Sequence, residues 1–173
     1  MFFDEFGFSF QEMLARTWAP KGKRPILRRV ERERRAVSTA VSFTLSGKIY
    51  KRHFAGSMKS EQVIVSLQHL QHHILGLIIL IWDRGSIHTS RKTQAYLDAN
   101  PEIIVEPLPP YAPELNPEEY CHGNVKQRLK NVTPDTVDDL CDSLDRGFAR
   151  LRRRPDLLLN FIHHAGLPVK QLW

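Results

Sequence analysis

Gly76-Leu77-Ile78-Ile79-Leu80-Ile81-Trp82-Asp83 is an unbroken apolar run between a glycine and an acid. Such a run is typical of a strand that is buried on both faces of a sheet. Asp83 follows it directly, and open α/β sheets bind ligands at this carboxyl edge of their strands. A carboxylate there is costly to desolvate unless it is paired or binds a metal. The alternative is that Asp83 only caps the turn from residue 83 to 86.

The patterns on either side of this run predict one α/β domain over residues 1–173, with a mixed central sheet flanked by helices. Ser46-Gly47 predicts a two-residue hairpin turn, and Ser60 predicts the N-cap of a helix. Prolines make residues 107–113 a stiff loop. The other predicted strands are 2–10, 37–45, 48–54 and 103–105. The predicted helices are 60–74, 90–99, 117–130, 134–150 and 155–164. Residues from about 132 to 173 form the C-terminal helical part of the domain.

Asp4 lies within the first predicted strand, among phenylalanines. The two-residue period of a strand places Phe2 and Phe6 on the same face as Asp4, and Phe3 and Glu5 on the opposite face. A carboxylate on an aromatic face needs a partner. That partner is either a metal ion or one of the many arginines.

Glu119 follows Asn116-Pro117-Glu118, at the start of a predicted helix. Asn116 suits the N-cap and Pro117 the first helical position, so Glu119 falls where the acid of a capping box would be. These patterns do not rank Glu118 against Glu119. Three oxygen ligands on separate rigid elements, Asp4, Asp83 and Glu119, would suit a pair of Mg²⁺ ions ~4 Å apart.

Lysine and arginine outnumber aspartate and glutamate by 25 to 19, and the excess gathers in residues 21–35, 126–130 and 146–154. Clustered positive charge indicates either a nucleic-acid surface or solvated helix faces. The candidate DNA contacts are Lys21, Lys23, Arg24, Lys126, Arg128 and Lys130. Trp18 and Tyr111 offer rings for base stacking, although packing within the protein is the favoured interpretation for Trp18.

The apolar run is far shorter than the ~20 residues that span a bilayer. No signal-peptide pattern opens the chain, and its two cysteines have no metal or redox spacing. We therefore expect a soluble cytoplasmic protein.

Three motifs carry a resemblance to a known family. The stretch from Trp82 to Ser90 (WDRGSIHTS) and the stretch from Leu108 to Glu119 (LPPYAPELNPEE) resemble the second and third catalytic motifs of mariner-superfamily DDE transposases, with the bacterial insertion-sequence branch as the closest match. The first motif is also similar, from Phe3 to Phe8 (FDEFGF), and so is the end of the chain near residues 151–167.

This resemblance implies an RNase H-like fold and metal-dependent DNA strand cleavage and strand transfer at transposon ends. It implies Asp4, Asp83 and Glu119 as catalytic residues that hold two Mg²⁺ ions, for which Mn²⁺ can substitute. Accessory roles would fall to His88, Asn116, Arg84 and Glu118. The implied partners are transposon ends and target DNA, with a homodimer possible on DNA, in a bacterial cytoplasm and associated with the nucleoid when bound.

The sequence departs from the family pattern at three places. Arg84 replaces a frequent asparagine, and His122 replaces a common tryptophan, which predicts weaker packing near Glu119. No helix-turn-helix pattern is found, so we expect the family's N-terminal DNA-binding domain to be absent. An inactive remnant that binds nucleic acid without catalysis is therefore an alternative, and an RNase H-like nuclease with another substrate is a weaker one.

Overall fold

The computed structural model describes residues 1–9, 15–26 and 36–167. These residues form one five-stranded sheet in the order β3-β2-β1-β4-β5. The long antiparallel part pairs β1 with β2 and β2 with β3, and the short parallel part pairs β1 with β4 and β4 with β5. The mixed sheet predicted from the sequence is confirmed. The strands are β1 (Phe2–Ser9), β2 (Ala36–Phe43), β3 (Ile49–Ala55), β4 (Ile78–Trp82) and β5 (Ile103–Pro107).

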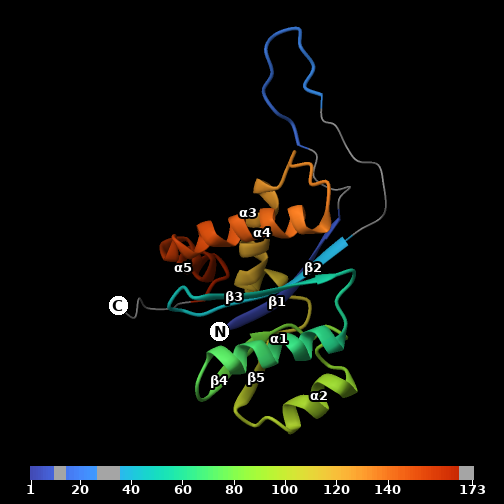
Figure 1. Cartoon of the computed structure of the whole chain (residues 1–173). Helices are drawn as coiled ribbons and strands as arrows, with labels where there is room; N and C mark the ends of the chain where they lie inside the picture. The colour runs from blue at the N-terminus through green and yellow to red at the C-terminus, as the bar shows by residue number, and fades with distance from the viewer. Residues whose placement is uncertain (10–14, 27–35, 168–173) are drawn as a thin grey trace.

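Helices cover the sheet from both sides (Figure 1). On one side, α1 and α2 pack with Phe3 and the inner residues of β4 and β5 into one apolar cluster. On the other side, α3, α4 and α5 pack with Phe2, Phe6 and Phe8 into a second cluster. The alternation predicted for β1 is therefore confirmed. The helices are α1 (Ser60–His73), α2 (Arg91–Asp98), α3 (Pro117–Arg128), α4 (Val137–Arg152) and α5 (Pro155–His164), with a 3₁₀ turn, η1 (Pro113–Leu115), before α3.

Two local predictions were wrong in detail. The turn between β2 and β3 is longer than two residues, because Thr44 and Lys48 still pair across it and the Gly47 N–H donates to the Thr44 carbonyl over 2.9 Å. Gly47 has φ +78°, which glycine adopts without strain. Ser60 is the first residue of α1 rather than its N-cap, and Lys59 occupies the cap.

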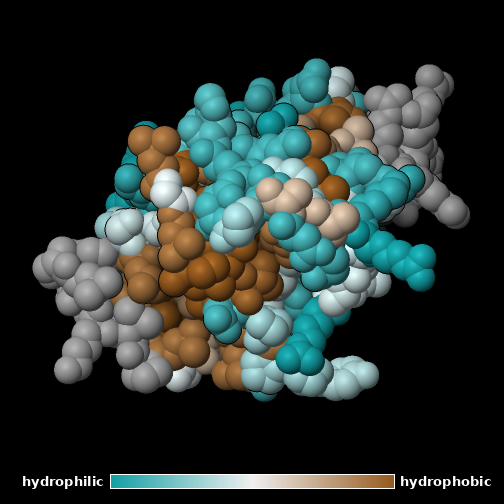
Figure 2. All heavy atoms as spheres, turned by 90° about the horizontal axis from the view of Figure 1, so that it is seen from below, coloured by the Kyte–Doolittle hydropathy of each residue, from teal (hydrophilic) through white to brown (hydrophobic). Residues whose placement is uncertain are grey.

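The prediction that β4 is buried on both faces was also wrong. Ile78, Leu80 and Trp82 are buried beneath α1 and α2, but Ile79 is 49% exposed and Ile104 on β5 is 41% exposed. The second helical layer packs mainly on β1, β2 and β3; on β4 its cluster reaches Ile81, which is only partly buried. Apolar residues form a brown area on the surface in Figure 2. No helix within the described ranges is long and apolar enough to cross a membrane.

Candidate active site

The parallel pairing of β1 with β4 brings two of the predicted acids to one edge of the sheet. Phe2 lies opposite Ile81, so Asp4 and Asp83 follow two residues later on neighbouring strands. Glu119 reaches the same place from the first turn of α3. All three side chains line one cleft of about 550 Å³. The other lining residues include Glu5, Arg84, Gly85, Asn116 and the proline-rich stretch from residue 108 to 113.

Asp4 is held from two directions and is nearly buried, with 8% of its surface exposed. Its Oδ1 accepts a hydrogen bond from the Glu5 N–H, and its Oδ2 accepts one from the Asn116 side chain, both over 2.7 Å. No described arginine or lysine forms an ion pair with it, contrary to the alternative drawn from the sequence. Burial, the charge of Glu5 and, more weakly, the charges of Asp83 and Glu119 raise the pKa of Asp4 to about 8. Without a metal, Asp4 therefore keeps its proton at neutral pH, and a cation bound beside it would favour the ionised carboxylate.

Asp83 uses one carboxylate oxygen for its own turn. Its Oδ1 accepts hydrogen bonds from the Gly85 N–H over 2.8 Å and from His88 Nδ1 over 2.7 Å. No described residue donates to Oδ2. The hydrogen bond from His88 holds the pKa of Asp83 below its usual range, so the group is ionised at neutral pH. Asp83 therefore caps its turn and still offers an oxygen to a ligand.

Asn116 connects α3 to Asp4. Its Oδ1 accepts from the Glu118 N–H over 3.1 Å while its amide group donates to Asp4. Its own N–H donates to the Pro113 carbonyl over 2.9 Å. The predicted capping box with Glu119 was therefore wrong, because the backbone donor that Glu119 would need is already taken. Glu119 remains exposed and lines the cleft.

Glu118 points the other way, into the protein, and is fully buried. Neither of its carboxylate oxygens has a hydrogen-bond partner among the described residues. Burial and the nearby charge of Asp4 raise the pKa of Glu118 well above its usual value, and interactions with Cys121 and the Phe43 backbone lower it by less. His122 Nε2 lies 3.6 Å from Glu118 Oε2, too far for a normal hydrogen bond. Of the two acids, only Glu119 is open to a ligand.

His122 fills its position as a buried aromatic residue. It is 2% exposed, and its ring lies 4.1 Å from that of Phe6 between centroids. Burial lowers the pKa of His122 to about 3, so the ring is neutral. The expected loss of packing here is offset by the contact with Phe6, although Nε2 has no hydrogen-bond partner among the described residues.

Comparison with known proteins agrees with this geometry. The family model described as DDE superfamily endonuclease matches residues 1–141. The chain belongs to this family. The Mos1 strand transfer complex matches with a TM-score of 0.66 and 19% identity, over 98% of this chain and 55% of the Mos1 chain. The catalytic domain of Mos1 mariner transposase matches with a TM-score of 0.54 and 19% identity, over 78% of this chain and 76% of that one.

An intasome of simian T-cell lymphotropic virus also matches, with a TM-score of 0.55 and 19% identity over 83% of this chain and 45% of the viral one. At such identities the likeness establishes the fold, which is that of the RNase H-like catalytic domains of DDE transposases. The chain spans about half the length of the Mos1 chains in paired-end and strand transfer complexes, covering 55% of each. No curated protein matches the sequence.

The acids of the cleft suit a hard cation, although they do not enclose one by themselves. Among the described residues, no three acidic, histidine or cysteine side chains lie close enough together to hold a metal ion. Mg²⁺ keeps several waters and is usually bound by one or two carboxylates together with substrate phosphates. The open cleft, the available oxygen of Asp83 and the Asp4 carboxyl without a cationic partner fit that mode, in which substrate phosphates would complete the ligand set.

Exposed basic residues lie on α3, on the loop over residues 15–26 and in the cleft itself. Lys126 follows Glu119 by seven residues, which places it along the same side of α3, and Lys130 is exposed just beyond the end of that helix. Arg128 is exposed on the last turn. Lys21, Lys23 and Arg24 are exposed on a loop that extends away from the body (Figure 1). Arg84 lines the cleft itself.

Two aromatic side chains, those of Trp18 and Tyr111, are fully exposed and do not pack within the protein. Trp18, on the extended loop, is 100% exposed, so the preference for packing within the protein was wrong. Tyr111 is equally exposed on the cleft wall and has φ +58°. Both rings are therefore free to meet a ligand.

Sequence reasoning singled out His88 but missed its partner Glu5. His88 is 1% exposed, and its Nε2 donates to Glu5 Oε1 over 2.7 Å while Nδ1 donates to Asp83. Burial lowers the pKa of His88, but hydrogen bonds and charges from Asp83 and Glu5 outweigh it and raise the pKa to about 10. The two-residue period of the strand placed Glu5 on the face opposite Asp4. Nothing in that pattern indicated that His88 would contact Glu5.

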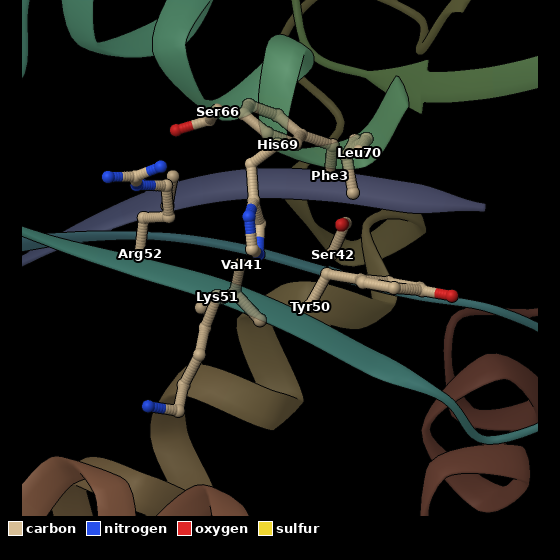
Figure 3. A pocket seen from close by; sticks show the side chains of 10 residues that line it. Phe3, Val41, Ser42, Tyr50, Lys51, Arg52, Ser66, His69 and Leu70 are labelled. Carbon is tan, nitrogen blue, oxygen red and sulfur yellow. The ribbon is translucent and has the colours of Figure 1, made fainter. Parts of the chain in front are cut away.

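A second pocket lies between α1 and the antiparallel strands and is lined by Phe3, Ser42, Tyr50, Ser66 and His69, among others (Figure 3). Its volume is about 10 Å³, room for at most one water molecule. It therefore offers no alternative active site.

Proposed function

We propose that this chain is a transposase catalytic domain that cleaves DNA at transposon ends and joins the freed ends to target DNA. Asp4, Asp83 and Glu119 hold two Mg²⁺ ions, or Mn²⁺ ions in their place. The observation that carries the proposal is the convergence of these three acids on one cleft in which Asp4 has no cationic partner among the described residues. The Mos1 structures solved with Mg and with Mn support the choice of metal.

When bound, such a metal pair activates a water or a 3′-hydroxyl and stabilises the leaving oxygen of the phosphodiester. The protein supplies position and charge. Asn116 orients the Asp4 carboxylate, and the turn after β4 orients Asp83. Glu119 projects from the rigid first turn of α3. Arg84, at the cleft, is placed to contact a phosphate.

DNA is the proposed partner, as it is for Mos1 in its paired-end complex with the left transposon end. Its backbone follows Lys126 and Lys130 away from the cleft, and Lys21, Lys23 and Arg24 on the extended loop contact it from the side. Trp18 and Tyr111 stack on bases. Because these contacts neutralise phosphates, binding weakens as salt concentration rises.

The motifs around Asp83 and Glu119 place the protein, in our proposal, in the bacterial insertion-sequence branch, acting in the cytoplasm and at the nucleoid. A homodimer on DNA would let one copy process each transposon end. The match covers only 55% of the Mos1 chains in the paired-end and strand transfer complexes, so the proposal does not assign recognition of specific end sequences to these residues.

The test uses the purified chain and supercoiled plasmid, because the end sequences are not known. Nicking is expected with MnCl₂ or MgCl₂, none with EDTA, and a loss of at least about 100-fold in Asp83→Asn, which removes a proposed metal ligand. Glu106→Gln, an exposed acid on β5 outside the cleft, is the matched control.

Three results separate the alternatives. Nicking that Asp83→Asn leaves unchanged refutes the proposed site. Salt-sensitive DNA binding with no metal-dependent nicking identifies a non-catalytic remnant. Preferential cleavage of RNA–DNA hybrids in a parallel assay identifies a nuclease of another class.

A further inference from the structure

The side chains of Glu5, His88 and Asp83 form a continuous hydrogen-bonded chain behind the cleft. Glu5 Oε1 and Asp83 Oδ1 each lie 2.7 Å from a different ring nitrogen of His88. The chain therefore joins β1 to the turn after β4 through a single imidazole ring. Glu5 is adjacent to Asp4, so the link ties together the two strands that deliver the first two acids.

The ring of His88 has little freedom to turn. It stacks on Trp82 with centroids 4.3 Å apart and planes at 6°, and the edge of Phe3 closes another side at 6.0 Å. The His88 N–H donates to the Gly85 carbonyl over 3.0 Å, and its carbonyl accepts from the Gln94 side chain over 3.0 Å. Ring packing and the backbone hydrogen bonds thus hold the His88 ring in place independently of its contact with Asp83.

This fixed ring determines which way the Asp83 carboxylate points. His88 Nδ1 and the Gly85 N–H both hold Oδ1, so the carboxylate can rotate about its bond only by breaking two hydrogen bonds. The close approach requires glycine at position 85, since a Cβ there would lie 2.9 Å from Asp83 Oδ1 and 3.6 Å from His88 Nδ1. Asp83 lines the cleft, and its Oδ2 has no hydrogen-bond partner among the described residues, so this oxygen is available to a ligand there.

We propose that Glu5 and His88 are positioning residues that hold Asp83 in its metal-binding orientation. The inference rests on the proposed function, because it concerns how a metal ligand is oriented. His88 is buried behind the cleft, and the Glu5 side chain is held by its hydrogen bond to the His88 ring. Removing one residue that orients a metal ligand in this way typically lowers metal affinity by roughly 10–100-fold.

The test measures Mn²⁺ binding to the metal-free protein by titration calorimetry, without DNA. The expected result for Glu5→Ala and for His88→Gln is a dissociation constant about 10–100-fold higher than that of the wild type. Glu5→Gln keeps an acceptor oxygen toward His88 and should recover part of that loss. Glu106→Ala, an exposed acid outside the cleft, is the control and should bind Mn²⁺ as the wild type does.

Thermal unfolding in EDTA accompanies each variant, because His88 is buried and His88→Gln can lose stability. Glu5 lies at the edge of the cleft, so Glu5→Ala and Glu5→Gln keep the test valid if His88→Gln does not fold. The inference is supported if Mn²⁺ affinity falls in Glu5→Ala at unchanged melting temperature and returns in part in Glu5→Gln.

Two kinds of result overturn the positioning role, and they have different consequences for the proposed function. If Asp83→Asn weakens Mn²⁺ binding but Glu5→Ala does not, the positioning role is wrong and the proposed metal site stands. If the wild-type protein binds no Mn²⁺ without DNA, the inference fails; if the wild type also shows no metal-dependent nicking, or if Asp83→Asn binds Mn²⁺ equally well, the proposed function fails with it.

Discussion

The raised pKa of Asp4 makes the stability of the metal-free protein depend on pH in a specific direction. The folded-state pKa is about 8, and the ordinary value of 3.8 applies to the unfolded chain. Between these values the folded protein keeps a proton that the unfolded chain releases. Rising pH therefore favours unfolding across this window, and the penalty is complete above pH 8.

The size of the effect follows from proton linkage. One group contributes at most about 1.4 kcal/mol per pH unit, so Asp4 accounts for up to about 3 kcal/mol between about pH 5.5 and about pH 7.5. Other groups titrate as well, including His88, whose raised pKa also makes stability fall above its ordinary value of 6.5. Asp4→Asn, which cannot titrate, isolates the share of Asp4.

The assay is urea unfolding in EDTA at several pH values for the wild type and Asp4→Asn. The free energy of unfolding should fall more steeply with pH in the wild type. Because metal binds the deprotonated carboxylate, MnCl₂ should raise the melting temperature of the wild type more at pH 8 than at pH 6. Equal slopes in the two proteins, or a larger MnCl₂ effect at pH 6, would refute the assignment of a raised pKa to Asp4.

Three further outcomes are expected. Glu118→Met should raise the free energy of unfolding in urea by about 1–3 kcal/mol, because it removes a buried carboxyl without hydrogen bonds. Glu119→Gln should leave stability almost unchanged and abolish plasmid nicking. If nicking were instead lost in Glu118→Met and kept in Glu119→Gln, Glu118 would be the metal ligand. Gly85→Ala should raise the Mn²⁺ dissociation constant at least about 10-fold with little loss of stability, since the added methyl group meets only the end of a side chain; unchanged affinity would contradict the close approach. Replacing Lys126 and Lys130 together by alanine should lower the slope of log affinity against log salt by about 2 for duplex DNA in fluorescence anisotropy, and an unchanged slope would remove them from the DNA path.

Several features of the site followed from local pattern. The apolar run that ends at Asp83 predicted a strand with an acid at its carboxyl edge, and the alternation in Phe2–Ser9 placed Asp4 and Glu5 on opposite faces. The helix signals at Asn116 and Pro117 placed α3 correctly. These predictions succeeded because the repeat of a strand and the chemistry of a helix start depend on neighbouring residues.

Other features depended on how the elements pack. Glu118 and Glu119 are adjacent on a helix whose residues differ by about 100° in direction, so only the docking of α3 on β1 decides which acid enters the cleft. The exposure of Ile79 follows from where the second helical layer ends, and the meeting of Glu5 with His88 from the pairing of β1 with β4. The sequence by itself determined the elements and the acids at their ends. Local pattern could not show which side chains share the cleft, because contacts between residues far apart in the chain leave no periodic trace in the sequence. Only the family resemblance had grouped Asp4, Asp83 and Glu119, and tertiary structure alone decided that Glu5 meets His88.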